Sequence, residues 1–305
     1  MPLHLEMIAQ VIIMILQLLD WAQTINHQNH PPTEQGVNMG GNSNFCTLNV
    51  NAQINSGTFS TGLLLFKHTA SAWRTSIGTF AVSTGKWYWE ACQPADKSGN
   101  GFPVGAYDLS DGKFASAQEA DYPGQAISTF GTSYSIYSYG SSTRSAYRYN
   151  GAETNFQDLG TGAAGDVWQC ALDLDNGKLF FGKNNTWDNS ANPATGTNPI
   201  SSTLTTTSQG GWTPITCSYS SPGSEVYIQN FGQDSAFGGN KSTGSANAAD
   251  GNGFGDFYYA PPSGFLALCS NNLPISADID PAQTSSNYPS KNFNIVKYTG
   301  TGTSQ

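Results

Sequence analysis

The chain has 305 residues, a formal net charge of −9, and only 11% charged residues. Its 12 Lys and Arg are scattered singly, which excludes the basic stripe of a nucleic-acid-binding protein. Glycine (34 residues) and aromatic residues (12%) alternate with Ser, Thr and Asn, a composition typical of short strands joined by tight turns.

The N-terminal segment, residues 1–44, differs from the rest of the chain. Residues 7–21 read MIAQVIIMILQLLDW, which is short for a membrane span and lacks the preceding Lys or Arg of a signal peptide. One interpretation is a short helix that forms a trimerising stalk. We also hypothesise that residues 1 to about 26 are a frameshifted or mis-started translation, because plausible codons read out of frame give a polar composition like the rest of the chain. Residues 27–44 then form a linker rich in Pro, Gly and Asn.

From residue 45 onward the pattern predicts a β-rich body. Short apolar or aromatic runs alternate with Gly, Ser and Asn clusters, as strands alternate with turns. The expected strands lie within residues 48–67 (two strands), 73–82, 85–91, 102–107, 212–219 and 225–231. A Gly/Ser/Asn-rich insert at 236–256 and a C-terminal extension at 257–305 follow, in which residues 257–273 and 293–298 are expected to be ordered.

Tyrosines recur near period two between residues 134 and 149, on both sides of Gly140. This spacing predicts a Tyr-studded hairpin with one face exposed to water. Tyrosine couples an apolar ring to a polar tip, so such a cluster serves either sheet packing or an interface.

The clearest predicted element is a hairpin within residues 165–184. Val167 to Leu174 and Lys178 to Gly182 read as its strands, and Asn176-Gly177 predicts a type I′ turn with positive φ at both residues. Asp173 and Asp175 also suggest the start of a calcium loop. However, its twelfth position is an asparagine rather than a glutamate. We therefore predict no metal site and expect these carboxylates to support the turn.

Five cysteines are spread through the chain without the close spacing of a zinc site. We expect buried thiols, since three of the cysteines interrupt strand-like runs, while one or two disulfides remain an alternative. The positions are Cys46, Cys92, Cys170, Cys217 and Cys269.

Four stretches resemble the SPRY family. They are the aromatic strand at 85–90, Val104-Gly105-Ala106, the hairpin at 165–184, which resembles the family's signature hairpin, and Trp212-Thr213-Pro214. The sequence departs from the family at Trp168-Gln169-Cys170 and at Asn185, where glycine is common. The resemblance implies an all-β, concanavalin-like antiparallel β-sandwich over residues 45–235. It also implies no catalytic centre and ligand binding through loops at one end.

The tail resembles a narrower group, the structural proteins of tailed phages, many of them marine. Residues 260–269, 272–274 and 296–302 resemble segments that follow SPRY-like domains in those proteins, and residues 44–49 resemble their lead-in. The resemblance implies a virion protein of the tail or tail fibre, hence an extracellular location. It also leads us to expect a chain truncated at Gln305.

The function expected from these features is binding without catalysis. We expect loop aromatics, namely Tyr107, Tyr122, Trp187 and Tyr219, to contact a protein partner or a host-surface glycan. We expect no cofactor, no nucleic acid and no membrane span, and a homo-oligomer such as a trimer stays open.

Two alternatives remain. One is an intracellular, cytoplasmic SPRY adaptor that binds a protein partner. The other is a glycan-active enzyme on a concanavalin-like sandwich, which needs two carboxylates ~5–10 Å apart, for which Glu90 and Asp173 are candidates. His68 is the one histidine after the linker, so a histidine-dependent nucleophile would have to use it.

Overall fold

The computed structural model describes residues 43–55, 57–67, 72–94, 101–118, 120–138, 145–205, 210–219, 227–242 and 248–274. The predicted N-terminal helix, residues 27–42 of the linker, His68 and the stretch 293–298 lie outside these ranges. Among the helices within them, none has the length and apolar character needed to cross a membrane.

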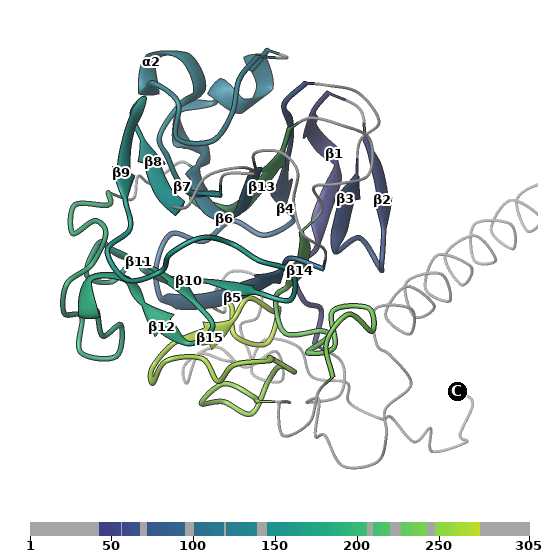
Figure 1. Cartoon of the computed structure of the whole chain (residues 1–305), viewed down its shortest axis with the longest axis vertical. Helices are drawn as coiled ribbons and strands as arrows, with labels where there is room; N and C mark the ends of the chain where they lie inside the picture. The colour runs from purple at the N-terminus through teal and green to yellow at the C-terminus, as the bar shows by residue number, and fades with distance from the viewer. Residues whose placement is uncertain are drawn as a thin grey trace, which may run out of the picture. The chain divides into compact units, whose positions relative to one another are not determined.

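Two sheets make up the described part of the chain (Figure 1). The first sheet has the order β1-β4-β13-β6-β7-β8-β9, and its strands are Leu48–Ile54, Arg74–Gly78, Trp212–Ser218, Gly101–Asp108, Ser133–Ser138, Ser145–Tyr149 and Ala152–Asn155. The second has the order β12-β11-β10-β5-β14-β3-β2, with strands Thr186–Trp187, Lys178–Lys183, Val167–Asp173, Lys86–Cys92, Ile228–Asn230, Leu65–Lys67 and Thr58–Ser60.

Every pairing along these two sheet orders is antiparallel. The described helices are short: η1 (Leu109–Asp111), η2 (Lys113–Ser116), α2 (Ile127–Phe130) and η3 (Asp188–Ser190). The predicted all-β antiparallel sandwich is therefore confirmed.

The core between the sheets is rich in tryptophan. On β5, Trp87 and Trp89 alternate with Tyr88 and Glu90, so the two sets point to opposite faces of the second sheet. Both tryptophans are 1% exposed. The aromatic strand predicted from the sequence thus places side chains on both faces of the second sheet.

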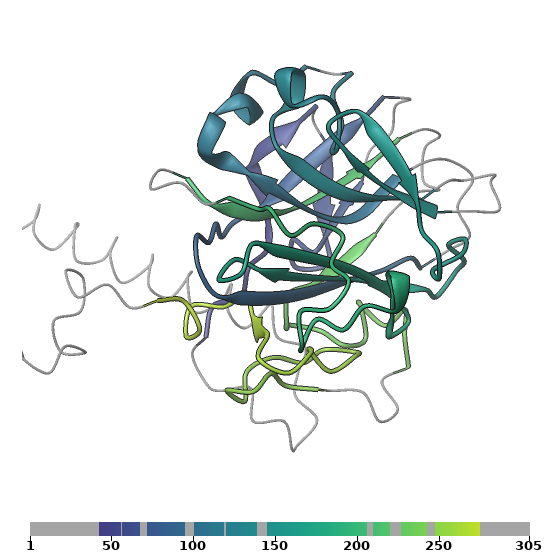
Figure 2. The ribbon, with the colours of Figure 1, turned by 90° about the vertical axis from the view of Figure 1, so that its left-hand side faces the viewer.

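The outer face of the first sheet is covered in part by the segment between β6 and β7. This segment carries η1, η2 and α2 and lies on the side of the first sheet away from the second (Figures 1 and 2). Phe130 of α2 is fully buried against Ile77 of β4, Tyr107 of β6 and Ile215 of β13. These contacts fix the segment on the sheet, so that it can hold side chains in defined positions.

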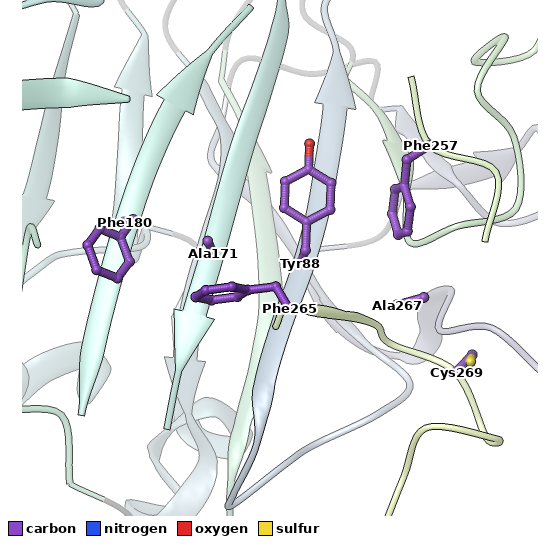
Figure 3. Packing of buried hydrophobic residues seen from close by; sticks show 7 residues of the cluster. All are labelled: Tyr88, Ala171, Phe180, Phe257, Phe265, Ala267 and Cys269. Atoms are coloured by element: carbon purple, nitrogen blue, oxygen red, sulfur yellow. The ribbon is translucent and has the colours of Figure 1, made fainter. Parts of the chain in front are cut away.

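The outer face of the second sheet is covered by a segment from the end of the chain. Phe257, Phe265, Ala267 and Cys269 pack on side chains from β5, β10 and β11 (Figure 3). Strand β15 (Leu266–Ala267) pairs in parallel with Trp87 and Tyr88 of β5, beside the part of β5 that β14 leaves unpaired. The predicted domain boundaries at residues 235 and 256 stay a prediction. On both sides of each boundary, residues pack against the second sheet.

The hairpin predicted near Asn176 is confirmed, while its turn type is wrong. Asp173 pairs with Lys178, which leaves a four-residue loop in which Gly177, with φ of 64°, has positive φ and Asn176 does not. The Asp173 carboxylate accepts hydrogen bonds from the backbone N and side-chain Nδ2 of Asn176. These bonds favour the longer loop over the two-residue type I′ turn.

The Tyr-rich hairpin is confirmed as strands β7 and β8, but β7 has no wet face. All six residues of β7 are buried, and Tyr134 and Tyr137 are each 5% exposed. The reason is that the sandwich core covers one side of β7 and other aromatic rings cover the second. The five cysteines are buried and free, as the first of the two interpretations predicts.

Candidate functional site

Five aromatic rings and one arginine gather on the outer face of the first sheet. We call this set, Trp73, Phe102, Tyr122, Tyr137, Tyr219 and Arg148, the aromatic face. Trp73 lies at its centre, with ring centroids 4.6 Å from Tyr219, 5.0 Å from Tyr122 and 5.4 Å from Phe102. Phe102 and Tyr137 are buried, whereas Trp73, Tyr122 and Tyr219 are half-buried. The latter three rings are therefore partly accessible at the surface.

Strand β6 brings these residues together through a β-bulge. Gly105 pairs with Ile215 and Phe102 pairs with Cys217, so three steps along β6 match two along β13. The extra residue reverses the alternation of side chains. As a result, Phe102 and Tyr107 lie on the same face of the sheet despite their odd spacing.

Arg148 of β8 connects the polar and aromatic parts of the face. Its guanidinium lies 4.3 Å from the centroid of the Tyr137 ring and 5.2 Å from that of Tyr122. It donates to the Tyr122 hydroxyl at 3.1 Å and forms an ion pair with Glu153 at 2.8 Å. These contacts hold the planar guanidinium in one orientation, so that it fixes the Tyr122 and Tyr137 rings beside it.

Tyr122 and Tyr219 are therefore brought together, as two of the four loop aromatics predicted to bind. Tyr122 lies in the segment after η2, and Tyr219 follows β13 directly. Both rings contact Trp73, which sequence analysis did not select. The other members that it missed, Phe102, Tyr137 and Arg148, lie on strands and carry no loop signal.

Tyr107 and Trp187 lie elsewhere. Tyr107 is inside β6 instead of in a loop and is 0% exposed, and its hydroxyl donates to the Phe130 carbonyl at 2.8 Å. Burial also raises the pKa of Tyr107. Trp187 belongs to β12 on the second sheet, where its ring covers Gly182 and packs with the C-terminal segment. The loop position expected for Tyr107 is thus wrong, and Trp187 lies outside the aromatic face.

The two carboxylates considered for glycan hydrolysis do not form a pair. Glu90 lies opposite Gln169 and Asp173 opposite Lys86, so they are four residues apart along β5 and β10. At ~3.3 Å per residue this is ~13 Å, beyond the ~5–10 Å of a glycosidase pair. Both side chains are also buried, at 0% and 1% exposure.

Each of these carboxylates has a structural partner. Glu90 accepts hydrogen bonds from the backbone N of Tyr258 at 2.6 Å, from the Tyr88 hydroxyl and from Asn230. Asp173 forms an ion pair with Lys86 at 3.0 Å. Both acids are therefore engaged in structural contacts around β5.

Metal and thiol chemistry find little support in the described ranges. Within them, His, Cys, Asp and Glu form no group of three that could hold a metal ion. Asp175, the second acid of the suspected calcium loop, accepts from the backbone N of Gly85 at 2.7 Å. Burial raises the pKa of the Cys46 thiol to about 11 and that of Cys92 to about 12, so both are unreactive at neutral pH.

Comparison with known proteins gives structural matches alone. No protein-family model matches the sequence, and no curated protein matches it. Among solved structures, the TRIM65 PSpry domain aligns with a TM-score of 0.42 and 14% identity, covering 61% of this chain and 92% of that domain. The SPRY domain of human HERC1 aligns with a TM-score of 0.39 and 17% identity, covering 60% of this chain and 96% of that domain. Because both TM-scores are below 0.5, the fold is assigned from the strand pairing of this chain and not from these matches.

Proposed function

We propose that this chain is a non-catalytic binding module of the SPRY type that engages a protein partner through the aromatic face. The observation that carries the proposal is the gathering of Tyr122 and Tyr219 around Trp73 on the first sheet, with Arg148 held against Tyr122. Tyrosine, tryptophan and arginine are the residues most enriched in the energetic centres of protein interfaces. The buried rings of Phe102 and Tyr137 support them from below.

The charge distribution supports a protein partner over a nucleic acid. Arg148 is the cation of the face, and its ion pair with Glu153 leaves little net positive charge. With a net charge of −9 over the whole chain, phosphate groups would be repelled.

A place in the tail of a phage virion is the finer part of the proposal. Its support is the likeness of residues 260–269 and 296–302 to tailed-phage structural proteins. An intracellular adaptor is the competing role. Genes for capsid and tail proteins beside this one would favour the virion, and a host regulatory operon would favour the adaptor.

Binding through the aromatic face can be tested with peptides selected from a random library against the full chain. We expect Tyr219→Ala and Tyr122→Ala to weaken binding at least tenfold, because each removes an interface ring from the face. Trp187→Ala is the matched control, since its half-buried ring lies on the second sheet. Equal affinity of the wild type and both face variants, measured by calorimetry on folded protein, would refute the proposal.

A further inference from the structure

A concavity lies on the outer face of the first sheet, between β1 and the segment that follows β6. Its volume is about 700 Å³, within the range of ~300–1,000 Å³ for small-molecule pockets. It adjoins the aromatic face, because the side chain of Asn55 lines it and donates to the backbone carbonyl of Trp73 at 2.8 Å. The lining residues combine apolar side chains with amides, and none of those described is charged.

The apolar part of the lining forms one continuous surface. Ile54 and Ile77 are buried in the cluster on the sheet, and Leu109 and Phe114 pack against that cluster from the segment after β6. Phe114 is half-buried and supplies an aromatic ring to the pocket. This surface suits a ligand with a flat or gently curved apolar side.

The polar residues of the lining are Asn51, Gln53, Asn55 and Gln118. Gln53 is held at both ends by local bonds, because its Nε2 donates to the Val50 carbonyl at 3.0 Å and its Oε1 accepts from the Gly57 backbone N at 3.1 Å. Gln118 Nε2 donates to the Ser116 carbonyl at 2.9 Å. A primary amide has two N–H donors and two acceptor lone pairs. The bond to Ser116 thus orients the Gln118 amide and leaves its oxygen and its second N–H for further hydrogen bonds.

This chemistry excludes several classes of ligand. A phosphate, carboxylate or ammonium group would lose its hydration without meeting an opposite charge. A wholly apolar ligand would instead cover the amides and leave them without partners. The ligand that remains is neutral, with hydrogen-bonding groups at its edge and C–H groups on its face.

An added peptide strand is also disfavoured at this place. β1 is the edge strand of its sheet and Val50 is 41% exposed, so β-augmentation would be the usual mode of peptide binding. However, the Val50 carbonyl already accepts from Gln53, and the Asn51 backbone N donates to the Asn49 side chain at 3.0 Å. Such bonds protect the edge against a further strand.

We propose that this pocket binds an uncharged carbohydrate, a short neutral oligosaccharide. Its hydroxyls bond to the amide of Gln118, and the C–H face of a sugar ring packs on Phe114 and Leu109. This site goes beyond the protein-binding function proposed above and does not depend on it, because none of the aromatic-face residues lines the pocket.

The test is a glycan array probed with the full chain, followed by calorimetry with the neutral sugars that bind and with their uronic-acid and amino-sugar counterparts. Gln118→Ala should weaken binding about tenfold by removing one hydrogen-bonding group. Ala115→Trp, at an exposed position of the lining, should abolish binding by filling the pocket. Gln157→Ala removes another exposed amide elsewhere and should have no effect.

Neutral-sugar binding that both pocket variants weaken and Gln157→Ala leaves intact would support the proposal. It is overturned if no neutral glycan binds, if the charged counterparts bind more tightly, or if both pocket variants retain wild-type affinity. Thermal unfolding of each variant shows that a loss of binding does not come from a loss of folding. Intact peptide binding by Gln118→Ala separates this site from the aromatic face.

Discussion

Glu90 illustrates how one buried acid can hold a distant part of the chain. Its carboxylate accepts from the backbone N of Tyr258 and Tyr259, which lie 168 and 169 residues away in sequence. Burial raises its pKa from 4.5 to about 7, even though hydrogen bonds from Tyr258, Tyr88 and Asn230 oppose this shift. Desolvation therefore outweighs the hydrogen bonds.

This raised pKa makes stability depend on pH in a definite direction. Between pH 4.5 and about 7 the folded state binds a proton at Glu90 that the unfolded state has lost, so the free energy of unfolding falls as pH rises. The full effect is at most about 3 kcal/mol. We expect Glu90→Gln to flatten this part of the curve, as measured by urea unfolding at pH 5, 6, 7 and 8. Identical pH dependence in the variant and the wild type would show that Glu90 does not titrate there.

Among the secondary-structure elements, β15 and the segment around it have the widest consequences. Phe265 is 1% exposed and packs over β5 and β10 together with Phe257 (Figure 3). The segment thus completes the second sheet and buries its outer face. The aromatic face of the first sheet, which this segment does not cover, keeps half-buried rings at Trp73, Tyr122 and Tyr219.

If the segment is part of the folded core, Phe265→Ala should be strongly destabilising. We expect a loss of about 3–5 kcal/mol in the free energy of unfolding, as for other fully buried phenylalanines. Phe59→Ala is the matched control, because Phe59 is half-buried on edge strand β2 and should lose less. Chemical denaturation measures both, and a loss at Phe265 no larger than at Phe59 would contradict this role.

The positions of the strands could be predicted well from the sequence. Which side chains contact one another across the fold could be predicted less well. The alternation in 167–183 and the Asp-Asn-Gly turn identify β10 and β11, because local signals are sufficient for a hairpin. Phe102 could not be assigned to the aromatic face, since the bulge in β6 reverses the alternation without a sequence signal. Trp187 was misplaced because Gly182, five residues earlier, gives its ring a place to pack. The pairing of β15 with β5 is long-range and leaves no local pattern.

In the whole molecule, the two outer faces of the sandwich differ in character. The second sheet is sealed by the C-terminal segment, with Tyr88, Ala171 and Phe180 fully buried under it. The first sheet presents the aromatic face and the uncharged pocket side by side, joined through Asn55 and Trp73. In our proposal the half-buried rings of the first sheet bind a partner, whereas Trp187 on the second sheet packs against the C-terminal segment.

Hydrogen–deuterium exchange of the full chain with and without a selected peptide tests this division most directly. Our account predicts that the peptide slows exchange at residues 73–78, 120–122, 145–149 and 215–219, which border the aromatic face, and leaves 178–187 and 257–269 unchanged. Protection confined to 178–187 and 257–269 would contradict it, because binding would then occur on the second sheet.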